Sequence, residues 1–356
     1  MKSPSQPVSI RIIADDLTGA CDAAVAFACV GMVTEVEPSW DLRESSDVQV
    51  VAFNTESRDI SPTASTVRMK QVAEYFVEDG AHQIFKKIDS VFRGNSYTEI
   101  ASIVASMSHD LAILAPAYPE LARTIVGGEL HYRDVSGDHA ISILRELQKT
   151  GLDPKIVAAG AEIAHRHQLL LCDSHTQQDL RHTVEAALAL PTARRILWIG
   201  SGGLAHALAT SLGLSSIESL PAITGGKVLF VVGSDHPVTL QQLEHLKRRE
   251  PEAIVLPISR SITESALRQR IDPFLSQGIA CLFATGGDTA LAVCRALNIR
   301  RLRVESEFAR GLPQSRIVGG PLHGMTFLLK SGGFGDENVL FRIAETFASK
   351  EMRSAQ

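Results

Sequence analysis

Residues 10–20 read Ile-Arg-Ile-Ile-Ala-Asp-Asp-Leu-Thr-Gly-Ala, an apolar run that ends in two consecutive carboxylates and a Thr-Gly pair. A short apolar run followed by a longer amphipathic one predicts a buried strand and then a helix. We expect the strand at Ile10–Ala14 and the helix at Thr18–Val30. Asp15 and Asp16 then lie at the carboxyl end of the strand, where open α/β sheets bind ligands. Adjacent carboxylates there can accept hydrogen bonds from hydroxyl groups or hold a metal ion.

A simpler role is open for part of this motif. Asp16 or Thr18 can cap the following helix, because their side chains accept hydrogen bonds from the first backbone N–H groups of a helix. A cap accounts for one of these residues but not for both carboxylates. We therefore predict a ligand contact for Asp15, and for Asp16 we keep both a ligand contact and a helix cap.

The same alternation of short apolar and longer amphipathic runs continues along the chain, which predicts parallel sheets covered by helices. The expected strands are Ile10–Ala14, Val48–Phe53, Gln83–Lys86, Leu111–Ala115, Arg195–Ile199, Val228–Val232, Ala253–Pro257, Ile279–Ala284 and Phe327–Lys330. The expected helices are Thr18–Val30, Thr63–Glu78, Thr98–Ser108, Thr239–Arg249 and Asp288–Leu297. The least regular region, residues 136–167, is assigned as helical.

A Ser-, Gly- and Pro-rich stretch, Leu212–Lys227, interrupts this alternation and predicts a linker. The chain has 356 residues, which is typical of two domains. We therefore predict an α/β protein of two domains, residues 1–213 and 225–356, each with a mainly parallel sheet flanked by helices.

Composition excludes several classes of protein. Hydrophobic residues make up 45% and charged residues 21% of the chain, which is the balance of a folded, soluble protein. The net charge of −5 and the lack of a basic cluster argue against a nucleic-acid partner. No apolar run reaches the roughly 18 residues of a membrane-spanning helix, and residues 1–10 lack the apolar centre of a signal peptide. The five cysteines form no C-x-x-C pair, so we expect a reducing, cytoplasmic location.

The loop after the strand near residue 85 concentrates polar side chains. Within Phe85–Asn95 (FKKIDSVFRGN) stand cations, a carboxylate, a hydroxyl and an amide. Lys87 and Arg93, with Arg58 from the end of another strand, are able to bind a carboxylate, and Asp89 and Asn95 to bind hydroxyls. For Lys86 and Glu56 we prefer an ordinary structural role.

Three glycine-rich turns follow predicted strands in the second half of the chain. They are Val231–Pro237 (VVGSDHP), Thr285–Ala290 (TGGDTA) and Lys330–Gly335 (KSGGFG). Glycines let backbone N–H groups approach a phosphate, and a helix N-terminus adds a positive dipole. A tight turn with an Asp cap would explain TGGDTA by itself, and neither a Walker A loop nor G-x-G-x-x-G is present. Three such turns in one sheet favour a nucleotide site.

The sequence resembles the four-carbon acid sugar kinase family, whose members phosphorylate acids such as threonate, erythronate and 3-oxo-tetronates with ATP. The resemblance runs in family order through almost the whole chain. The segments that carry it are Ala14–Ala20 with Asp22, Lys86–Asn95, Ala115–Pro119 with Arg123, Ile199–Ala205, Val232–Pro237 with Gln242, Thr285–Ala290 and Lys330–Gly335. The chain looks short for the family between Tyr132 and Leu169, which leaves its substrate preference open.

The resemblance implies an acid-sugar domain at residues 1–213, a nucleotide domain at 225–356 and an active site in the cleft between the domains. The implied ligands are ATP, Mg²⁺ and a small acid sugar, with no nucleic acid or membrane partner; self-association into a homo-oligomer is left open. The implied substrate contacts are Asp15, Arg58, Lys87, Ile88, Asp89 and Ser90, and the residue pattern described above adds Asp16, Arg93 and Asn95. The implied nucleotide contacts are Ser234, Gly286, Gly287, Asp288, Thr289, Gly332, Gly333 and Gly335.

The residue that accepts the hydroxyl proton is not decided by the motifs, because Asp15, Asp89 and Asp288 each follow a predicted strand. We favour Asp89 as the base, with Asp15 anchoring a hydroxyl, and assign no residue to a metal. Two other functions compete with a kinase. One is a phosphatase of the haloacid dehalogenase type, whose two catalytic carboxylates stand two positions apart whereas Asp15 and Asp16 are adjacent. The other is a catalytically idle protein that binds a nucleotide or a sugar acid.

Overall fold

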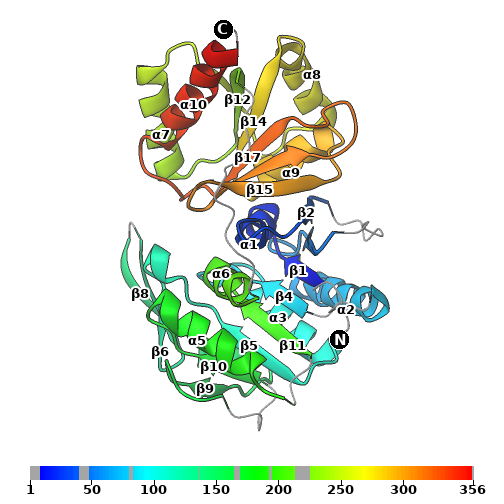
Figure 1. Ribbon diagram of the computed structural model, residues 1–356, viewed down its shortest axis with the longest axis vertical. Helices are drawn as coiled ribbons and strands as arrows, with labels where there is room; N and C mark the ends of the chain where they lie inside the picture. Colours follow the sequence, from blue (N-terminus) through cyan, green and yellow to red (C-terminus); the bar gives the residue numbers. More distant parts are fainter. Residues whose placement is uncertain are drawn as a thin grey trace, which may run out of the picture. The chain divides into compact units, whose positions relative to one another are not determined.

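The computed structural model describes residues 9–39, 48–79, 83–134, 136–163, 169–191, 195–212 and 225–354 (Figure 1). The chain forms two compact units. Unit 1 comprises Met1–Met32 and Leu42–Ser216, and unit 2 comprises Val33–Asp41 and Ile217–Gln356. Both units are α/β and contain a largely parallel sheet with helices packed on it, which confirms the predicted fold class.

Unit 1 is built on a seven-stranded parallel sheet in the order β3-β1-β4-β11-β5-β10-β9. Its central strands β5 and β11 are apolar along their whole length because helices cover a parallel sheet, whereas β4 ends in two buried lysines. Helices α1, α6 and α5 pack side by side, and α2 packs against α3. The strands are β1 (Ile10–Ala14), β3 (Val50–Asn54), β4 (Gln83–Lys87), β5 (Leu111–Ala115), β9 (Lys155–Val157), β10 (Leu169–Cys172) and β11 (Ile196–Gly200). The helices are α1 (Leu17–Ala28), α2 (Pro62–Asp79), α3 (Ser96–Ser106), the 3₁₀ turn η1 (Pro119–Leu121), α4 (Ile143–Lys149), α5 (Gln177–Leu188) and α6 (Gly202–Ser211).

Unit 2 has a mixed sheet in the order β13-β12-β14-β17-β16-β15-β2. The first four strands are parallel, and the rest pair antiparallel. Helices α7 and α10 pack together, as do α8 and α9 (Figure 1). The strands are β2 (Thr34–Glu37), β12 (Lys227–Val232), β13 (Ile254–Pro257), β14 (Ile279–Thr285), β15 (Leu302–Ala309), β16 (Leu312–Ile317) and β17 (Thr326–Lys330). The helices are α7 (Pro237–Arg249), α8 (Glu264–Leu275), α9 (Gly287–Ala296) and α10 (Val339–Ser354).

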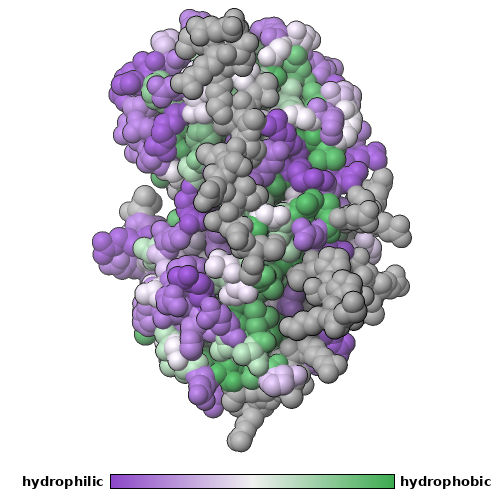
Figure 2. All heavy atoms as spheres, viewed as in Figure 1, coloured by the Kyte–Doolittle hydropathy of each residue, from purple (hydrophilic) through white to green (hydrophobic). Residues whose placement is uncertain are grey.

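The core of unit 2 lies between the sheet and the α7–α10 pair. Its largest side chains include Phe230, Phe283 and Phe347, which are at most 1% exposed. On the face of unit 2 that Figure 2 shows, hydrophilic residues predominate among those that are coloured, with some hydrophobic residues between them. Among the described helices, none has the length and apolar character to cross a membrane.

Within the described residues 136–163, the helical assignment made for residues 136–167 is wrong outside α4; residues 164–167 lie outside the described residues. A separate antiparallel sheet is formed by β6 (Thr124–Val126), β7 (Glu129–Asp134) and β8 (Gly137–Ser142), and β9 joins the edge of the parallel sheet. These strands are short and half-exposed, so they lack the apolar run of a buried strand; cross-strand contacts such as the stacked Tyr132 and His139 rings accompany the pairing instead. Residues 213–224 of the expected linker lie outside the described residues.

One strand from the N-terminal part of the chain belongs to unit 2. β2 pairs antiparallel with β15, with Val36 opposite Leu302 and Glu35 opposite Arg303. The Glu35 side chain is 2% exposed and accepts hydrogen bonds from Arg303 at 2.5 and 3.1 Å, and Arg301 lies 3.6 Å away. A buried carboxylate needs such partners, so this ion pair fixes β2 on the sheet.

We expect Glu35→Ala to loosen β2 and β15 selectively. The substitution leaves two arginines without their acceptor, but these are about 40% exposed and can be rehydrated. The local opening free energy should therefore fall by about 1–3 kcal/mol. Hydrogen exchange of the β2 and β15 amides measures this change, with Glu252→Ala as the exposed control in unit 2. Unchanged exchange in both strands would contradict the role assigned to Glu35.

Candidate functional site

The first group of predicted residues gathers at the carboxyl ends of β1 and β3. Asp15 is 2% exposed and receives a bidentate contact from Arg58, Nε to Oδ2 at 2.7 Å and Nη2 to Oδ1 at 3.0 Å. The same guanidinium donates from Nη1 to Asp16. The backbone places Arg58 there, because the N–H of Ser57 donates to the carbonyl of Asp15 at 3.0 Å. The donors of Arg58 are thus engaged by carboxylates of the protein itself.

Asp16 does cap the helix that follows it. Its Oδ1 accepts from the N–H of Gly19 at 2.6 Å, and its Oδ2 accepts from the Thr18 hydroxyl at 2.8 Å. A Cβ atom on Gly19 would lie 2.7 Å from Asp16 Oδ1, so this close approach requires glycine. The capping interpretation is confirmed for Asp16, which also contacts Arg58. Asp15 plays no such part and is held by Arg58 instead.

Asp89 organises the loop after β4. Its Oδ1 accepts from the backbone N–H groups of Val91 and Arg93 at 3.0 and 3.1 Å. Its Oδ2 accepts from the Arg93 side chain at 2.6 and 3.0 Å and lies 3.7 Å from Nη2 of Arg58. Arg58 therefore joins three carboxylates from the ends of two strands, β1 and β4.

The remainder of this loop is tied to the segment after β3. The amide nitrogen of Asn95 donates to the carbonyls of Ser57 and Ile60, both at 2.8 Å. Gly94 has φ +66°, and a Cβ there would lie 2.5 Å from the Arg58 carbonyl. Asn95 is 9% exposed, and the hydrogen bonds that its side-chain nitrogen donates all go to backbone carbonyls. The Ile88 side chain is fully buried, and Ile88 contributes its backbone carbonyl, which accepts a hydrogen bond from Lys87 Nζ.

The two lysines of β4 point to opposite faces of the sheet, as successive strand residues do. Lys86 is fully buried and lies 2.7 Å from Glu99, which is the structural role expected for it. Lys87 Nζ donates to the Ile88 carbonyl at 3.0 Å and lies 3.4 Å from Asp22. Asp22 Oδ1 is buried and accepts no hydrogen bond from the described residues.

The predicted site omitted two members of this group, Asp22 and Arg123. Arg123 donates from Nη1 to the Ser90 hydroxyl. Both residues were quoted in the family motifs, and Asp22 stands four positions after Thr18, on the same face of α1. The site group of unit 1 then holds four cations and four carboxylates; we call it the acid-sugar group. Its members are Arg58, Lys87, Arg93, Arg123, Asp15, Asp16, Asp22 and Asp89.

Burial and neighbouring charge act against each other on the three linked carboxylates. Burial alone would raise the pKa of Asp15, but the adjacent Arg58 outweighs it and holds that pKa below its usual value. For Asp89, the hydrogen bond from Arg93 likewise outweighs burial and lowers the pKa. For Asp16, burial prevails and raises the pKa. Asp15 and Asp89 are therefore ionised at neutral pH and serve as hydrogen-bond acceptors.

The second group of predicted residues gathers at the carboxyl ends of β12, β14 and β17. Gly286 has φ +88° and begins α9 with no side-chain cap, so the first N–H groups of this helix are available to a ligand. The three glycine-rich turns lie against one another. A Cβ on Gly233 would lie 2.4 Å from the Thr289 hydroxyl, and one on Gly332 would lie 2.8 Å from the Ser234 hydroxyl.

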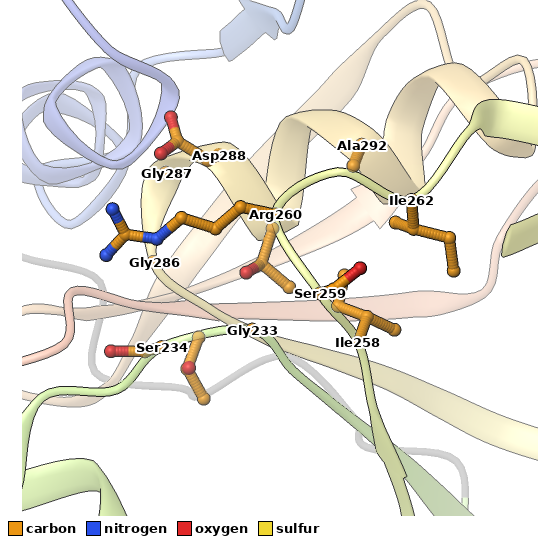
Figure 3. A pocket seen from close by; sticks show the side chains of 12 residues that line it. Gly233, Ser234, Ile258, Ser259, Arg260, Ile262, Gly286, Gly287, Asp288 and Ala292 are labelled. Atoms are coloured by element: carbon orange, nitrogen blue, oxygen red, sulfur yellow. The ribbon is translucent and has the colours of Figure 1, made fainter.

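A pocket opens beside these turns (Figure 3). Figure 3 shows the Arg260 side chain extending toward the turn of Gly286 and Gly287, with Asp288 on the far side of that turn. Arg260 was not predicted from the sequence, because a single cation outside a glycine turn forms no recognisable motif. The lining residues are Gly233, Ser234, Ile258, Ser259, Arg260, Ile262, Thr285, Gly286, Gly287, Asp288, Thr289 and Ala292.

This pocket combines groups that suit a nucleotide. Backbone N–H groups and a guanidinium suit phosphates, and the side chains of Ile258, Ile262 and Ala292 offer an apolar wall. Among the residues that the structure describes, no three or more His, Cys, Asp or Glu side chains are arranged to hold a metal ion.

Two family models match the chain, one in its N-terminal half and one in its C-terminal half. Residues 10–152 match the family model of a sugar-binding N-terminal domain, and residues 259–340 match that of a nucleotide-binding C-terminal domain. A D-threonate kinase from Cupriavidus necator is 30% identical over 423 aligned residues, covering 98% of this chain and all of the relative. Relatives at 24 and 25% identity are a D-erythronate kinase from Heliobacterium modesticaldum and a 3-oxo-tetronate kinase from Pseudomonas fluorescens.

The fold is also found among solved structures. A crystal structure from Salmonella typhimurium, described as that of a candidate tRNA synthase, aligns with a TM-score of 0.76. It covers 96% of this chain and 99% of the other chain at 17% identity. At this identity the likeness shows the fold alone.

Fold, site and relatives together define a phosphotransferase that acts on a hydroxyl group of a small acid sugar. The chain belongs to the four-carbon acid sugar kinase family. The comparisons favour neither the phosphatase nor the idle binding protein considered above.

The low pKa of Asp89 predicts a pH-dependent contribution to the stability of unit 1. Because the folded-state pKa lies below the usual 3.8, the contribution is complete at neutral pH and is lost as the pH falls below 3.8. Asp89→Asn should thus cost about 1–3 kcal/mol at pH 7, and the difference from the parent protein should shrink toward pH 3.

Urea unfolding at pH 7, 5 and 3 measures this difference. A Trp40→Phe background leaves Trp198 in β11 as the single tryptophan, so its fluorescence reports on unit 1. Asp153→Asn, at an exposed position of the same unit, is the control. An equal difference between parent and Asp89→Asn at pH 7 and pH 3 would refute the ion-pair assignment.

Proposed function

We propose that the protein is an ATP-dependent kinase that transfers the γ-phosphoryl group to a terminal hydroxyl of a four-carbon acid sugar. The candidates are threonate, erythronate and 3-oxo-tetronate, for which its relatives are named. The observation that carries the proposal is the uncapped start of α9 at Gly286, which lies against two further glycine turns. This arrangement offers phosphate several backbone N–H groups at once.

The acid-sugar group supplies the proposed substrate contacts in unit 1. Lys87 is the stronger candidate for the substrate carboxylate, because its ammonium has one backbone acceptor and one carboxylate as far as 3.4 Å away. Arg58 would share its guanidinium between that carboxylate and Asp15, which already holds two of its donors. The proposed contacts remain Asp15, Asp16, Arg58, Lys87, Ile88, Asp89, Ser90, Arg93 and Asn95.

The glycine turns supply the proposed nucleotide contacts in unit 2. The N–H groups that begin α9 would bind phosphate oxygens, and Arg260 adds a positive charge. The contacts proposed from sequence are Ser234, Gly286, Gly287, Asp288, Thr289, Gly332, Gly333 and Gly335.

Mg²⁺ fits the donors in this pocket. Protein sites hold this ion with one or two carboxylates together with nucleotide phosphates and water, and Asp288 is an exposed carboxylate on the pocket lining. Asp288 is thus the residue proposed to hold it. When bound, the ion neutralises charge on the transferred phosphoryl group.

Asp89 and Asp15 are the proposed catalytic residues. With their lowered pKa values they are weak proton acceptors, but an ionised carboxylate can still accept a hydrogen bond from the reacting hydroxyl and orient it. In a largely dissociative phosphoryl transfer, such orientation contributes more than early proton removal. A homo-oligomeric state and a cytoplasmic location stay predictions.

A substrate panel tests the proposed function. With Mg²⁺ and ATP, the protein should form ADP in the presence of D-threonate, D-erythronate or a 3-oxo-tetronate. It should discriminate against the neutral alcohols threitol and erythritol, because these offer no carboxylate for Lys87 and Arg58 to bind. ADP release by a coupled assay measures this preference. ADP formation that depends on none of the acids would overturn the proposal.

A second prediction concerns the turn that opens α9. Gly287→Val should weaken ATP binding by at least roughly tenfold, because a branched side chain blocks the approach of phosphate to the backbone. Calorimetric titration with MgATP measures the affinity. Val293→Ile, in the buried part of the same helix, adds apolar volume away from the turn and serves as the control. Normal ATP affinity in Gly287→Val would remove this turn from the nucleotide site.

A further inference from the structure

The last residue of β17 is a lysine whose side chain is fully buried. Lys330 is 0% exposed, and its ammonium donates to the carbonyls of Ser331 and Gly332 at 3.0 Å and of Phe334 at 3.2 Å. It also lies 3.2 Å from the Thr239 hydroxyl, which itself donates to the Gly332 carbonyl at 2.8 Å. Its partners are therefore neutral oxygens, most of them from the glycine-rich loop that follows β17.

Lys330 differs in this respect from the other two buried lysines of the predicted motifs. Lys86 lies 2.7 Å from Glu99, and Lys87 lies 3.4 Å from Asp22. In the described part of the chain, no carboxylate lies within ion-pair distance of Lys330. Burial lowers the pKa of Lys330 to about 7. A buried charge without an anionic partner is costly, so a function other than core stability would explain its presence.

The carbonyls that Lys330 binds determine where the glycine N–H groups point. In a trans peptide the C=O and the following N–H lie in one plane and point in opposite directions, and the chain contains no cis peptide among the described residues. The peptide units of the carbonyls bound to Lys330 carry the N–H groups of Gly332, Gly333 and Gly335. These N–H groups must therefore point away from the ammonium.

The hydrogen bonds of the loop agree with this orientation. The N–H of Phe334 is used within the loop, donating to the Ser331 carbonyl at 3.1 Å. In contrast, the N–H groups of Gly332, Gly333 and Gly335 have no acceptor among the described residues. Gly332 also lies against Ser234, beside the proposed nucleotide pocket.

Gln242 of α7 holds the same loop from a second side. Its side chain is 0% exposed, and its Nε2 lies 3.0 Å from each of the carbonyls of Phe334, Gly335 and Asp336. Lys330 and Gln242 thus donate hydrogen bonds to every backbone carbonyl from Ser331 to Asp336 except that of Gly333. The loop is left with its hydrogen-bond acceptors inside and its free donors outside.

We propose that Lys330, supported by Gln242, is a positioning residue that turns the N–H groups of Gly332, Gly333 and Gly335 outward to bind the phosphates of the nucleotide. The proposal rests on the proposed function, because the anion it invokes is the polyphosphate of ATP. The three peptide dipoles have their carbonyl ends at the ammonium and so extend its positive charge to the loop surface, where the phosphates would supply the missing negative charge. The lysine itself does not contact the nucleotide.

Lys330→Met tests this role, because methionine fills similar space without donors or charge. The full-length variant should bind MgATP about 10–100-fold more weakly, the loss expected for misdirected hydrogen bonds to a charged group. KM for ATP should rise by the same factor, whereas KM for the acid sugar should not change. A purely structural role would lower the fraction of folded protein without this selective effect. Lys227→Met, at an exposed lysine of the same sheet, is the control.

Calorimetry separates the two ways in which the account can fail. If the unmodified protein does not bind MgATP, the proposed function fails, and the positioning role fails with it. If the unmodified protein binds MgATP and Lys330→Met binds it equally well, the positioning role alone is overturned.

A measurement on the unmodified protein covers the case in which Lys330→Met does not fold. Hydrogen exchange of residues 331–336 should be fast without ligand and should slow markedly with saturating MgATP, because the free N–H groups gain phosphate acceptors. Residues 227–232 of β12 provide an internal reference with paired amides. Unchanged exchange in residues 331–336 under conditions where calorimetry shows ATP bound would overturn the proposal.

Discussion

The contact between the Arg58 guanidinium and three carboxylates is the constraint on which the polar site of unit 1 depends. Asp15 and Asp16 follow β1, Asp89 follows β4, and Arg58 itself follows β3. One side chain thus fixes the relative positions of three strand ends in a largely buried setting. The carboxylates are too close to one another to stay ionised together without this cation. Without Arg58 the strands would still pair, and Asp16 and Asp89 would keep their backbone partners, but Asp15 would lose the side chain that holds it.

In unit 2 the polar groups at the strand ends are mainly backbone N–H groups, whereas in unit 1 they are charged side chains. The phosphate site that we propose in unit 2 needs N–H donors that no other part of the protein uses. The start of α9 provides them because Gly286 leaves the helix uncapped, and the loop after β17 provides them because its carbonyls are bound from inside. In both units the polar groups lie at the carboxyl ends of parallel strands, where the strand core ends and the backbone becomes free to bind ligands.

The sequence predicted the parallel strands of both units except β9 and β10, because a strand covered by helices on both faces is largely apolar. β1, β5 and β11 are such strands, and the polar motifs that follow them mark their carboxyl ends. The antiparallel pairs β15–β16 and β7–β8 were missed because their exposed and buried residues mix without a continuous apolar run. The pairing of β2 with β15 joins residues about 270 positions apart, and nothing in the local sequence indicates such a partner.

The candidate site shows the same limit at the level of single residues. Sequence motifs named Arg58 and Asp15 but could not indicate that they bind each other, since that contact depends on the parallel pairing of β1 with β3. They named the glycines of the last motif but assigned Lys330 no role, because only the folded loop reveals which carbonyls its ammonium binds. The sequence thus predicts which polar residues stand at the strand ends, but it does not predict which of them bind one another.

The central claim is that the phosphoryl group of ATP is transferred to a hydroxyl of the acid rather than to water. ³¹P nuclear magnetic resonance of a reaction with Mg²⁺, ATP and D-threonate follows every phosphorus atom and tests this claim directly. The account predicts loss of the γ-phosphate signal with equal gains of ADP and a new phosphomonoester, whose coupling to two methylene protons marks a terminal hydroxyl. Formation of ADP with inorganic phosphate alone, for this acid and for D-erythronate and 3-oxo-tetronates, would contradict it.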